Sequence, residues 1–265
     1  MLLAVDVGNT QIKLGIFHSD SLIFNARLST DRLKTSDEYA IEINTLFLIH
    51  NIDAKSISGI IISSVVPSVT LPLKKSLETL TSVTALVIGK DIESGLNIAI
   101  DNPSTLGADL AVSCVAAKEN FNCPCIVIGM GTATTFSVLN KNGEMCGGAI
   151  MPGVAISLDA LVHGSSLLPS IGLTEPNKVI GKNTETCMRS GIVIGTACMV
   201  DGMCERIEKE LNEKCTVIAY GGLANVIIPS CKRNITICDN IMMEGLRIIY
   251  ENYLNNNLKP EKQSL

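Results

Sequence analysis

Two short turns, each preceded by a β-branched stretch, are the parts of this sequence best suited to chemistry. The first reads Asp-Val-Gly-Asn-Thr at residues 6–10 and is followed by Lys13, and the second reads Gly-Met-Gly-Thr at residues 129–132. Glycine lets backbone N–H groups approach a phosphate because no Cβ intrudes, and a threonine hydroxyl adds a donor. The Asp6 carboxylate could hold Mg²⁺ through water, since hard cations prefer oxygen ligands. The pair therefore indicates phosphate binding.

The two turns differ in one charged residue. When the turn glycines Gly8 and Gly131 are aligned, Gly129 takes the place of the carboxylate. A further Gly-Gly turn at 221–224 follows another β-rich stretch and favours the same interpretation. An ordinary hairpin is the alternative for the first turn alone, because Asp, Gly, Asn and Thr are common turn residues.

Strand and helix patterns along the chain occur in two similar runs. The first run predicts strands at 2–7, 12–17, 22–28, 59–65 and 83–88, with helices at 36–50 and 70–80. A helix at 106–119 ends the first run, and the second run predicts strands at 125–129, 134–139, 145–150 and 216–220, with helices at 153–162, 183–212 and 240–252. This order predicts an α/β protein whose two halves both begin with three consecutive strands. We expect domains at 1–117 and 118–265, with a cleft between them.

Composition excludes several classes of partner. Aromatic residues make up 3% of the chain and Trp is absent, so stacking platforms for single-stranded nucleic acid are not expected. The net charge of −5 also argues against a polyanion partner. No basic leader and no long apolar run is evident, and the ten cysteines lack paired C-x-x-C spacing. These features predict a cytoplasmic protein with no membrane partner.

The ordered motifs of the chain resemble those of type III pantothenate kinases, a family in the acetate/sugar kinase, Hsp70 and actin superfamily. The matching segments run collinearly along most of the sequence: D-V-G-N-T at 6–10, S-S-V-V-P at 63–67, G-L-N-I at 95–98, D-N-P at 101–103, G-A-D at 107–109, G-T-A-T-T-F at 131–136, G-G-A-I-x-P-G at 147–153, V-I-G-K-N-T at 179–184 and G-G-L-A at 221–224. The resemblance implies two ribonuclease H-like domains. It also implies ATP-dependent phosphorylation of pantothenate to 4′-phosphopantothenate, the first step of coenzyme A biosynthesis.

The resemblance also implies roles for individual residues. Asp109 would be the general base, Asp6 would bind Mg²⁺ through water, and the Gly-Gly turn would lie on the adenosine side. ATP would be bound by Asp6, Val7, Gly8, Asn9, Thr10, Gln11, Ile12, Lys13 and Thr132. The acceptor would be bound by Ile100, Gly107, Ala108, Asp109, Leu110 and, from the partner subunit of a homodimer, Thr184. Phosphoryl transfer does need a carboxylate that accepts the hydroxyl proton. Taken alone, Asp109 could equally be a favourable charge at a helix N-terminus.

Several departures from the family pattern fall on the acceptor and cation side. The family has Arg-Tyr where this chain has Ala99-Ile100, and it has Arg where this chain has Leu110. Its second turn carries an Asp that binds a monovalent cation, and Gly129 supplies no such ligand. One charge-assisted hydrogen bond is worth about 1.5–3 kcal/mol, so losing one predicts about 10- to 150-fold weaker binding of a carboxylate substrate.

These departures leave alternatives open. The chain could phosphorylate a different small hydroxyl compound, or it could be a catalytically weak nucleotide-binding or regulatory homologue. Because Gly129 supplies no carboxylate, it also stays open whether the protein requires K⁺ or NH₄⁺. A kinase for a small molecule would still use ATP and Mg²⁺ as its cofactors.

Overall fold

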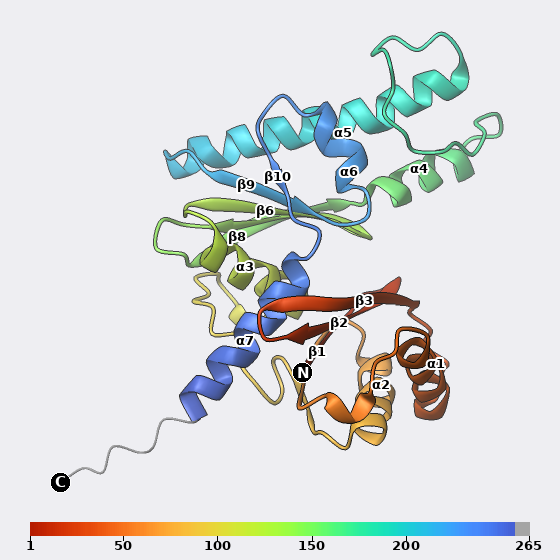
Figure 1. Cartoon of the computed structure of the whole chain (residues 1–265). Coiled ribbons are helices and arrows are strands. Elements are labelled where there is room, and N and C mark those ends of the chain that lie inside the picture. Colours follow the sequence, from red (N-terminus) through yellow and green to blue (C-terminus); the bar gives the residue numbers. More distant parts are fainter. Residues whose placement is uncertain (258–265) are drawn as a thin grey trace. The chain divides into compact units, whose positions relative to one another are not determined.

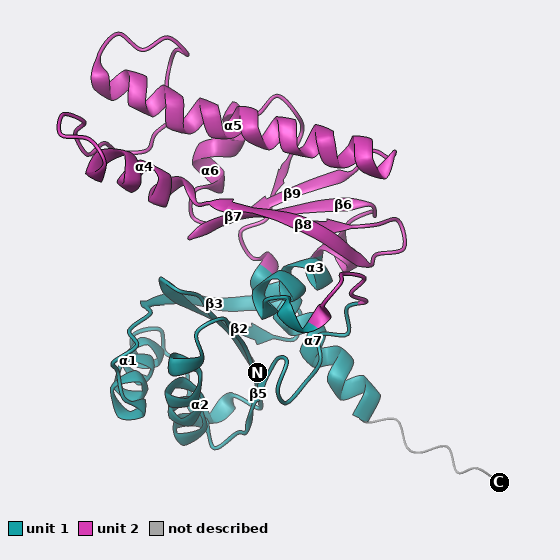
Figure 2. Ribbon diagram, turned by 180° about the vertical axis from the view of Figure 1, so that it is seen from behind, with its two compact units in different colours: residues 1–96, 104–116, 242–265 teal, residues 97–103, 117–241 magenta. Residues whose placement is uncertain are grey.

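The computed structural model describes residues 1–257 and divides into two compact units. Unit 1 comprises residues 1–96, 104–116 and the chain from Met242 on, and unit 2 comprises residues 97–103 and 117–241 (Figure 2). The units do not follow a single cut of the chain, because the last helix belongs to the first unit. The domain boundaries expected at 117 and 118 therefore stay a prediction.

Unit 1 is built on a mixed five-stranded sheet. Its strand order is β3-β2-β1-β4-β5, with β1 antiparallel to β2 and parallel to β4. The strands are β1 (Leu2–Val7), β2 (Gln11–His18), β3 (Ser21–Ser29), β4 (Gly59–Ser64) and β5 (Ala85–Val87).

Unit 2 repeats this topology. Its strands are β6 (Cys125–Met130), β7 (Ala133–Leu139), β8 (Met145–Pro152), β9 (Thr216–Tyr220) and β10 (Thr236–Ile237). Taken from the β8 edge, the order β8-β7-β6-β9-β10 matches that of unit 1, with the same antiparallel and parallel pairs. The predicted α/β class and the duplicated three-strand start are confirmed.

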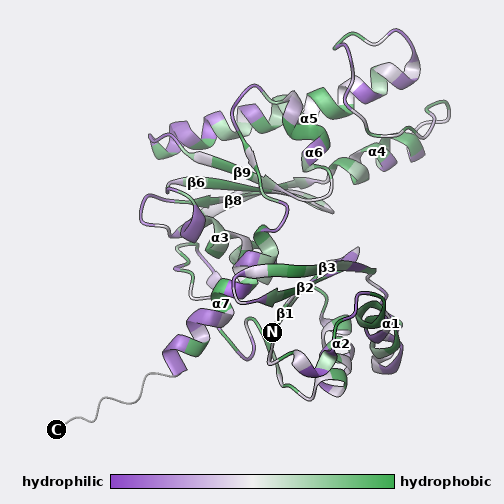
Figure 3. Ribbon diagram, in the orientation of Figure 1, coloured by the Kyte–Doolittle hydropathy of each residue, from purple (hydrophilic) through white to green (hydrophobic). Residues whose placement is uncertain are grey.

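Two helices cover one face of the sheet in unit 1. Helix α1 (Ser36–Ile49) begins at a Thr35 capping box and buries Tyr39, Ile43 and Phe47, which share one side at a spacing of four residues. Helix α2 (Pro67–Thr81) begins with proline in its first turn, where the missing N–H costs no helical hydrogen bond. Both helices pack on Leu3, Val5 and Val7 of β1, among other strand residues (Figure 1). Figure 3 shows hydrophobic residues along the strands and mixed ones along the helices.

The opposite face of this sheet receives α7 (Ile241–Asn257), and α7 also contacts α3 (Ala108–Asn120). A Cβ on Gly59 would meet the Tyr250 hydroxyl, and a Cβ on Gly15 would lie 2.6 Å from the Met243 sulfur. Glycine at these two strand positions therefore lets α7 approach the sheet closely.

The helices of unit 2 are α4 (Val154–His163), α5 (Thr184–Leu211) and α6 (Ala224–Ile227), and they lie over one face of its sheet in Figure 1. Val193, Ala197 and Val200 of α5 join a core with Ile126 and Ile128 of β6. Helix α5 is long and apolar enough to cross a membrane by length and composition, and a third of its most apolar stretch is buried. A core helix passes the same test, so α5 is weak evidence for a span.

The remaining short elements were not predicted from the sequence. They are α6, β10 and the 3₁₀ turns η1 (Ala54–Ser56), η2 (Pro103–Thr105) and η3 (Ile228–Ser230). Segments of two to four residues are too short for a hydrophobic period to be recognised.

Candidate functional site

Asp6 lies near the carboxyl end of β1, between Lys13 of β2 and Ser63 of β4. These two residues are its register partners on the neighbouring strands. Side chains alternate along a strand, so the core-facing Val5 and Val7 leave Asp6 on the other face of the sheet. The Lys13 Nζ lies 4.0 Å from the Asp6 Oδ2, and Asp6 is only 7% exposed. The sheet thus holds a buried carboxylate beside one lysine.

Burial dominates the ionisation of Asp6. It raises the pKa from 3.8 to about 6, although Lys13 acts to lower it. The Asp109 charge raises the pKa further, and a hydrogen bond from Ser63 lowers it. The Ser63 hydroxyl is fully buried and, among residues 1–257, makes no hydrogen bond of normal geometry, so we treat its contact with Asp6 as weak. One lysine therefore does not offset the cost of burying this carboxylate.

Asp109 occupies the first turn of α3. Its Oδ1 accepts a hydrogen bond from the Leu110 N–H at 2.9 Å, and backbone N–H groups lower its pKa. Burial is the larger effect and raises that pKa overall. A Cβ on Gly107 would lie 2.6 Å from the Asp109 Oδ1, so the glycine leaves the space that the carboxylate occupies. The Gly-Ala-Asp sequence therefore allows the carboxylate to fold back over the helix start.

The structure thus brings Asp6 and Asp109 together in unit 1, close enough for the Asp109 charge to raise the pKa of Asp6. Two buried carboxylates with raised pKa values are good proton acceptors, and added positive charge would stabilise their ionised form. Within residues 1–257, no group of three or more His, Cys, Asp or Glu side chains could hold a metal ion alone. These residues fit Mg²⁺, which keeps most of its water and takes one or two carboxylates.

The first turn, Gly8 to Thr10, connects β1 to β2 and is braced by the end of β3. The Gly8 N–H donates to the Gln11 carbonyl at 3.0 Å, and the Thr30 hydroxyl donates to the Gly8 carbonyl at 2.7 Å. Arg32 donates to the Asn9 side chain at 3.2 Å. These contacts fix a short, mostly exposed backbone segment whose N–H groups could bind phosphate.

The predicted ATP-binding residues differ in burial, and Gly8 and Lys13 are half-buried. Val7 and Ile12 are fully buried in the core of unit 1, so only their backbone could meet a ligand. Asn9, Thr10 and Gln11 are exposed. No sequence pattern had indicated a role for Thr30, Arg32 or Ser63. Ser63 begins the S-S-V-V-P segment and lies on β4, the strand beside β1. Its place in that segment was the one feature of the sequence that could have indicated a role.

The second turn, Gly131-Thr132, is one residue shorter than the first. The Gly131 N–H donates to the Ala133 carbonyl at 3.0 Å, and the Gly153 N–H donates to the Thr132 carbonyl at 3.1 Å. Gly221 has a φ of +113°, and a Cβ there would lie 2.3 Å from the Met130 carbonyl oxygen. Three glycine-containing segments of unit 2 therefore meet at the ends of β6 and β9.

The predicted acceptor residues are divided between the units. Gly107, Ala108, Asp109 and Leu110 belong to unit 1, whereas Ile100 belongs to unit 2 and is half-buried. Thr184 is the exposed first residue of α5, next to the Asn183 cap. A cavity of about 310 Å³ adjoins this helix start, and its lining includes Lys178, Lys182 and Arg189.

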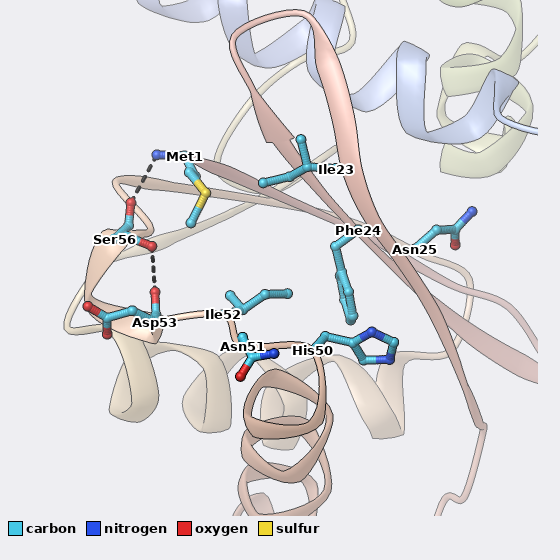
Figure 4. Close-up of a pocket in the computed structure, with 9 residues that line it drawn as sticks. All are labelled: Met1, Ile23, Phe24, Asn25, His50, Asn51, Ile52, Asp53 and Ser56. Carbon is cyan, nitrogen blue, oxygen red and sulfur yellow. Dashed lines mark hydrogen bonds between the residues drawn. The ribbon is translucent and has the colours of Figure 1, made fainter.

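A cavity of about 620 Å³ in unit 1 lies away from the carboxylates. Met1, Phe24, His50 and Asp53 are among its lining residues, and Figure 4 shows Phe24 and His50 side by side. Met1 precedes β1, whereas Asp6 is the second-last residue of that strand, which separates them by about 17 Å at 3.3 Å per residue. This cavity is therefore distinct from the Asp6 and Asp109 site.

Comparisons with known proteins give a consistent result. A family model described as type III pantothenate kinase matches residues 2–206. The chain is 44% identical to the type III pantothenate kinase of Geotalea daltonii over 251 residues, covering 95% of this chain and 98% of that protein. It is 41% identical to the protein of the same name from Moorella thermoacetica, covering 95% and 99%.

Solved structures at low identity show the fold alone. A protein proposed to be a Baf family transcriptional activator from Campylobacter jejuni matches with a TM-score of 0.59 at 17% identity, covering 97% of this chain and 100% of that one. A proposed 2-dehydro-3-deoxygalactonokinase from Sinorhizobium meliloti matches with a TM-score of 0.54 at 13% identity, covering 100% and 99%. The fold is thus shared with proteins described as sugar kinases.

Proposed function

Since the chain belongs to the type III pantothenate kinase family, we propose that it transfers the γ-phosphoryl group of ATP to pantothenate, giving 4′-phosphopantothenate for coenzyme A synthesis. One structural observation supports this proposal above the others. Asp6 and Asp109 lie within interaction range in unit 1, each with a raised pKa. A carboxylate of raised pKa is a better proton acceptor at neutral pH, provided that it is ionised.

Asp109 is the proposed general base. It takes the proton from the primary hydroxyl of pantothenate, and the freed oxygen attacks the γ-phosphorus. The bond between that phosphorus and the β–γ bridging oxygen breaks, and ADP leaves with the bond's electron pair. Positioning and charge neutralisation supply most of the rate in such transfers.

The proposed ATP contacts come from the first turn, Lys13 and Thr132. Backbone N–H groups of Asn9 and Thr10 donate to phosphate oxygens, and Lys13 adds a positive charge beside Asp6. Asp6 is the residue that would hold Mg²⁺ through water. When bound, Mg²⁺ would neutralise phosphate charge and offset the burial of Asp6.

The acceptor side is where this chain differs from its family pattern. Leu110 and Ile100 offer no cation to the pantothenate carboxylate, for which arginine is the natural bidentate partner. We therefore expect weaker pantothenate binding than an arginine would give. A less anionic hydroxyl compound is the second candidate acceptor, favoured by the half-buried Leu110 next to the general base.

The proposed assembly is a cytoplasmic homodimer in which Thr184 contacts the acceptor bound to the other subunit. Exposed large apolar side chains on unit 2 support a self-association surface. They include Ile150, Ile156, Leu161, Leu167, Val179 and Ile180.

A direct assay tests the function. Purified protein with ATP and Mg²⁺ is offered pantothenate, and phosphopantothenate is measured by mass spectrometry. We expect product from the native chain and about 10²- to 10⁴-fold slower product formation from Asp109→Asn. Nucleotide binding by calorimetry without any product would reject the pantothenate assignment. It would favour another acceptor or a catalytically weak, nucleotide-binding homologue.

A further inference from the structure

The position of Gly129 in unit 2 corresponds to that of Asp6 in unit 1. Each is the second-last residue of the central strand of its sheet. Asp6 has Lys13 and Ser63 as its register partners. Gly129 has Thr135 of β7 and Tyr220 of β9. At this position the duplicated fold therefore has a charged pair, Asp6 and Lys13, in unit 1 and two uncharged hydroxyl side chains in unit 2.

The space beside Gly129 is already occupied. A Cβ there would lie 2.8 Å from the Thr135 Oγ1, 3.0 Å from the Tyr220 hydroxyl and 3.1 Å from the Tyr220 Cζ. Gly129 has no positive φ, so its backbone conformation would accept other residues. The threonine hydroxyl and the tyrosine ring are thus what require glycine, and an aspartate could enter only if both moved away.

The same arrangement removes the negative charge that a bound cation would need. Gly129, Thr135 and Tyr220 carry no charge, and the family's carboxylate is the residue that Gly129 replaces. The protein itself therefore supplies no counter-charge to offset the cost of partly dehydrating a positive ion there. These residues therefore do not fit a monovalent cation in the way that the family pattern implies.

Two hydroxyl groups offer a different kind of stabilisation. Thr135 and Tyr220 are both half-buried, close to the Gly131-Thr132 turn that we propose for ATP. Hydroxyl groups donate hydrogen bonds to phosphate oxygens, and bonds to an ionised acceptor are about twice as strong as neutral ones. Fixed donors at the strand ends could thus act on the phosphate charge directly.

We infer that Tyr220 and Thr135 replace the monovalent cation at the second turn, donating hydrogen bonds to phosphate oxygens of bound nucleotide, so that the chain requires neither K⁺ nor NH₄⁺. This inference rests on the proposed use of ATP. It adds Tyr220 as a nucleotide-binding residue.

The first test is nucleotide affinity in different salts. Calorimetry with Mg²⁺ and β,γ-imido-ATP is run in K⁺, NH₄⁺, Na⁺ and tetramethylammonium chloride at equal ionic strength. The dissociation constant should change less than threefold, and initial rates with pantothenate should do the same. A change of threefold or more in favour of K⁺ or NH₄⁺, in either measurement, overturns the inference.

The second test removes the hydroxyls while keeping the side-chain shapes. Tyr220→Phe should weaken binding of the ATP analogue at least threefold, and Thr135→Val should do so in the same direction. Tyr253→Phe in α7 is the control, because it deletes a tyrosine hydroxyl from unit 1, outside both turns. Thermal unfolding of each variant checks its fold. A folded Tyr220→Phe with native affinity overturns the role of Tyr220.

A third variant restores the alternative chemistry. Gly129→Asp combined with Thr135→Ala and Tyr220→Ala supplies a carboxylate and the room for it, and should gain at least a threefold response of analogue affinity to K⁺. An unchanged response in a folded triple variant overturns the inferred exchange. Absence of phosphopantothenate in every salt, with analogue binding intact, would reject the pantothenate function alone.

Discussion

Asp6 and Gly129 occupy the same position in two sheets of identical strand order, and the residue paired with each on the following antiparallel strand is Lys13 in one and Thr135 in the other. One repeat has kept a charged site and the other an uncharged one. The charged repeat also carries Asp109. Proton and metal chemistry is therefore expected from unit 1, and neutral phosphate contacts are expected from unit 2.

Replacing Asp109 by asparagine should lower kcat by about 10²- to 10⁴-fold, the usual contribution of a general base. Asparagine keeps the size of the side chain but cannot accept the hydroxyl proton. Steady-state rates measure the loss, and calorimetry should show native-like nucleotide binding. Asp37→Asn in the first turn of α1 is the matched control, because it too removes a carboxylate from a helix start. Loss of activity in both variants would contradict a specific role.

Asp6→Asn should stabilise the fold at neutral pH while abolishing activity. Asp6 has a folded pKa of about 6 against 3.8 for the unfolded chain, so the folded state binds the proton more tightly. Its contribution to stability is full below pH 3.8 and is lost as pH rises to about 6. That pKa difference corresponds to about 3 kcal/mol, at 1.36 kcal/mol per pH unit.

Urea unfolding of the native chain and Asp6→Asn from pH 4 to 8 measures this effect. The variant should gain up to about 3 kcal/mol at pH 7, and the gain should shrink towards pH 4. A variant that is less stable than the native chain at pH 7 would show that Lys13 contributes more to Asp6 than burial costs.

Ser63→Ala should shift the acidic limb of the pH–rate profile to higher pH. The Ser63 hydroxyl lowers the pKa of Asp6, so its loss leaves the buried carboxylate harder to ionise. Because the hydroxyl makes no well-aligned hydrogen bond among the described residues, stability should change by less than about 1 kcal/mol. Ser76→Ala is the control, since Ser76 is equally buried but donates to a helix carbonyl. Equal profiles for both variants would reject a role for Ser63.

Leu110→Arg together with Ile100→Tyr should improve pantothenate turnover. The arginine offers the substrate carboxylate a charge-assisted contact, for which we expect about a 10- to 150-fold lower KM. Initial rates across pantothenate concentrations decide the outcome. No change, or a fall in kcat/KM, would show that the native pocket recognises its acceptor in another way.

The long, periodic and strongly apolar segments were predictable from the sequence. The helix over 36–50 follows from three apolar residues spaced four apart, and the strands around each turn follow from their β-branched runs. Asp6 was recognised from its place before a Gly-Asn-Thr turn, and Asp109 was recognised because its Gly-Ala-Asp segment resembles that of a known family. Their meeting in one unit could not be deduced, since it depends on how α3 packs beside the sheet.

Contacts of Thr30, Arg32 and Tyr220 could not be predicted from the sequence for a similar reason. Thr30 and Arg32 reach the first turn across more than twenty residues of sequence, and no local pattern marks that contact. From the sequence, Tyr220 was predicted only to end the strand before Gly221. Its place over Gly129 depends on strand register, which links β9 to β6 across about ninety residues.

The close approach of α7 to Gly15 and Gly59 has a consequence for how the protein is made. Residues 1–116 leave the ribosome long before Met242 does, so the sheet that carries Asp6 first exists without the helix that covers one of its faces. Unit 2 is complete by Ile241 and can close first. The charged half of the enzyme is therefore begun first during synthesis and finished last.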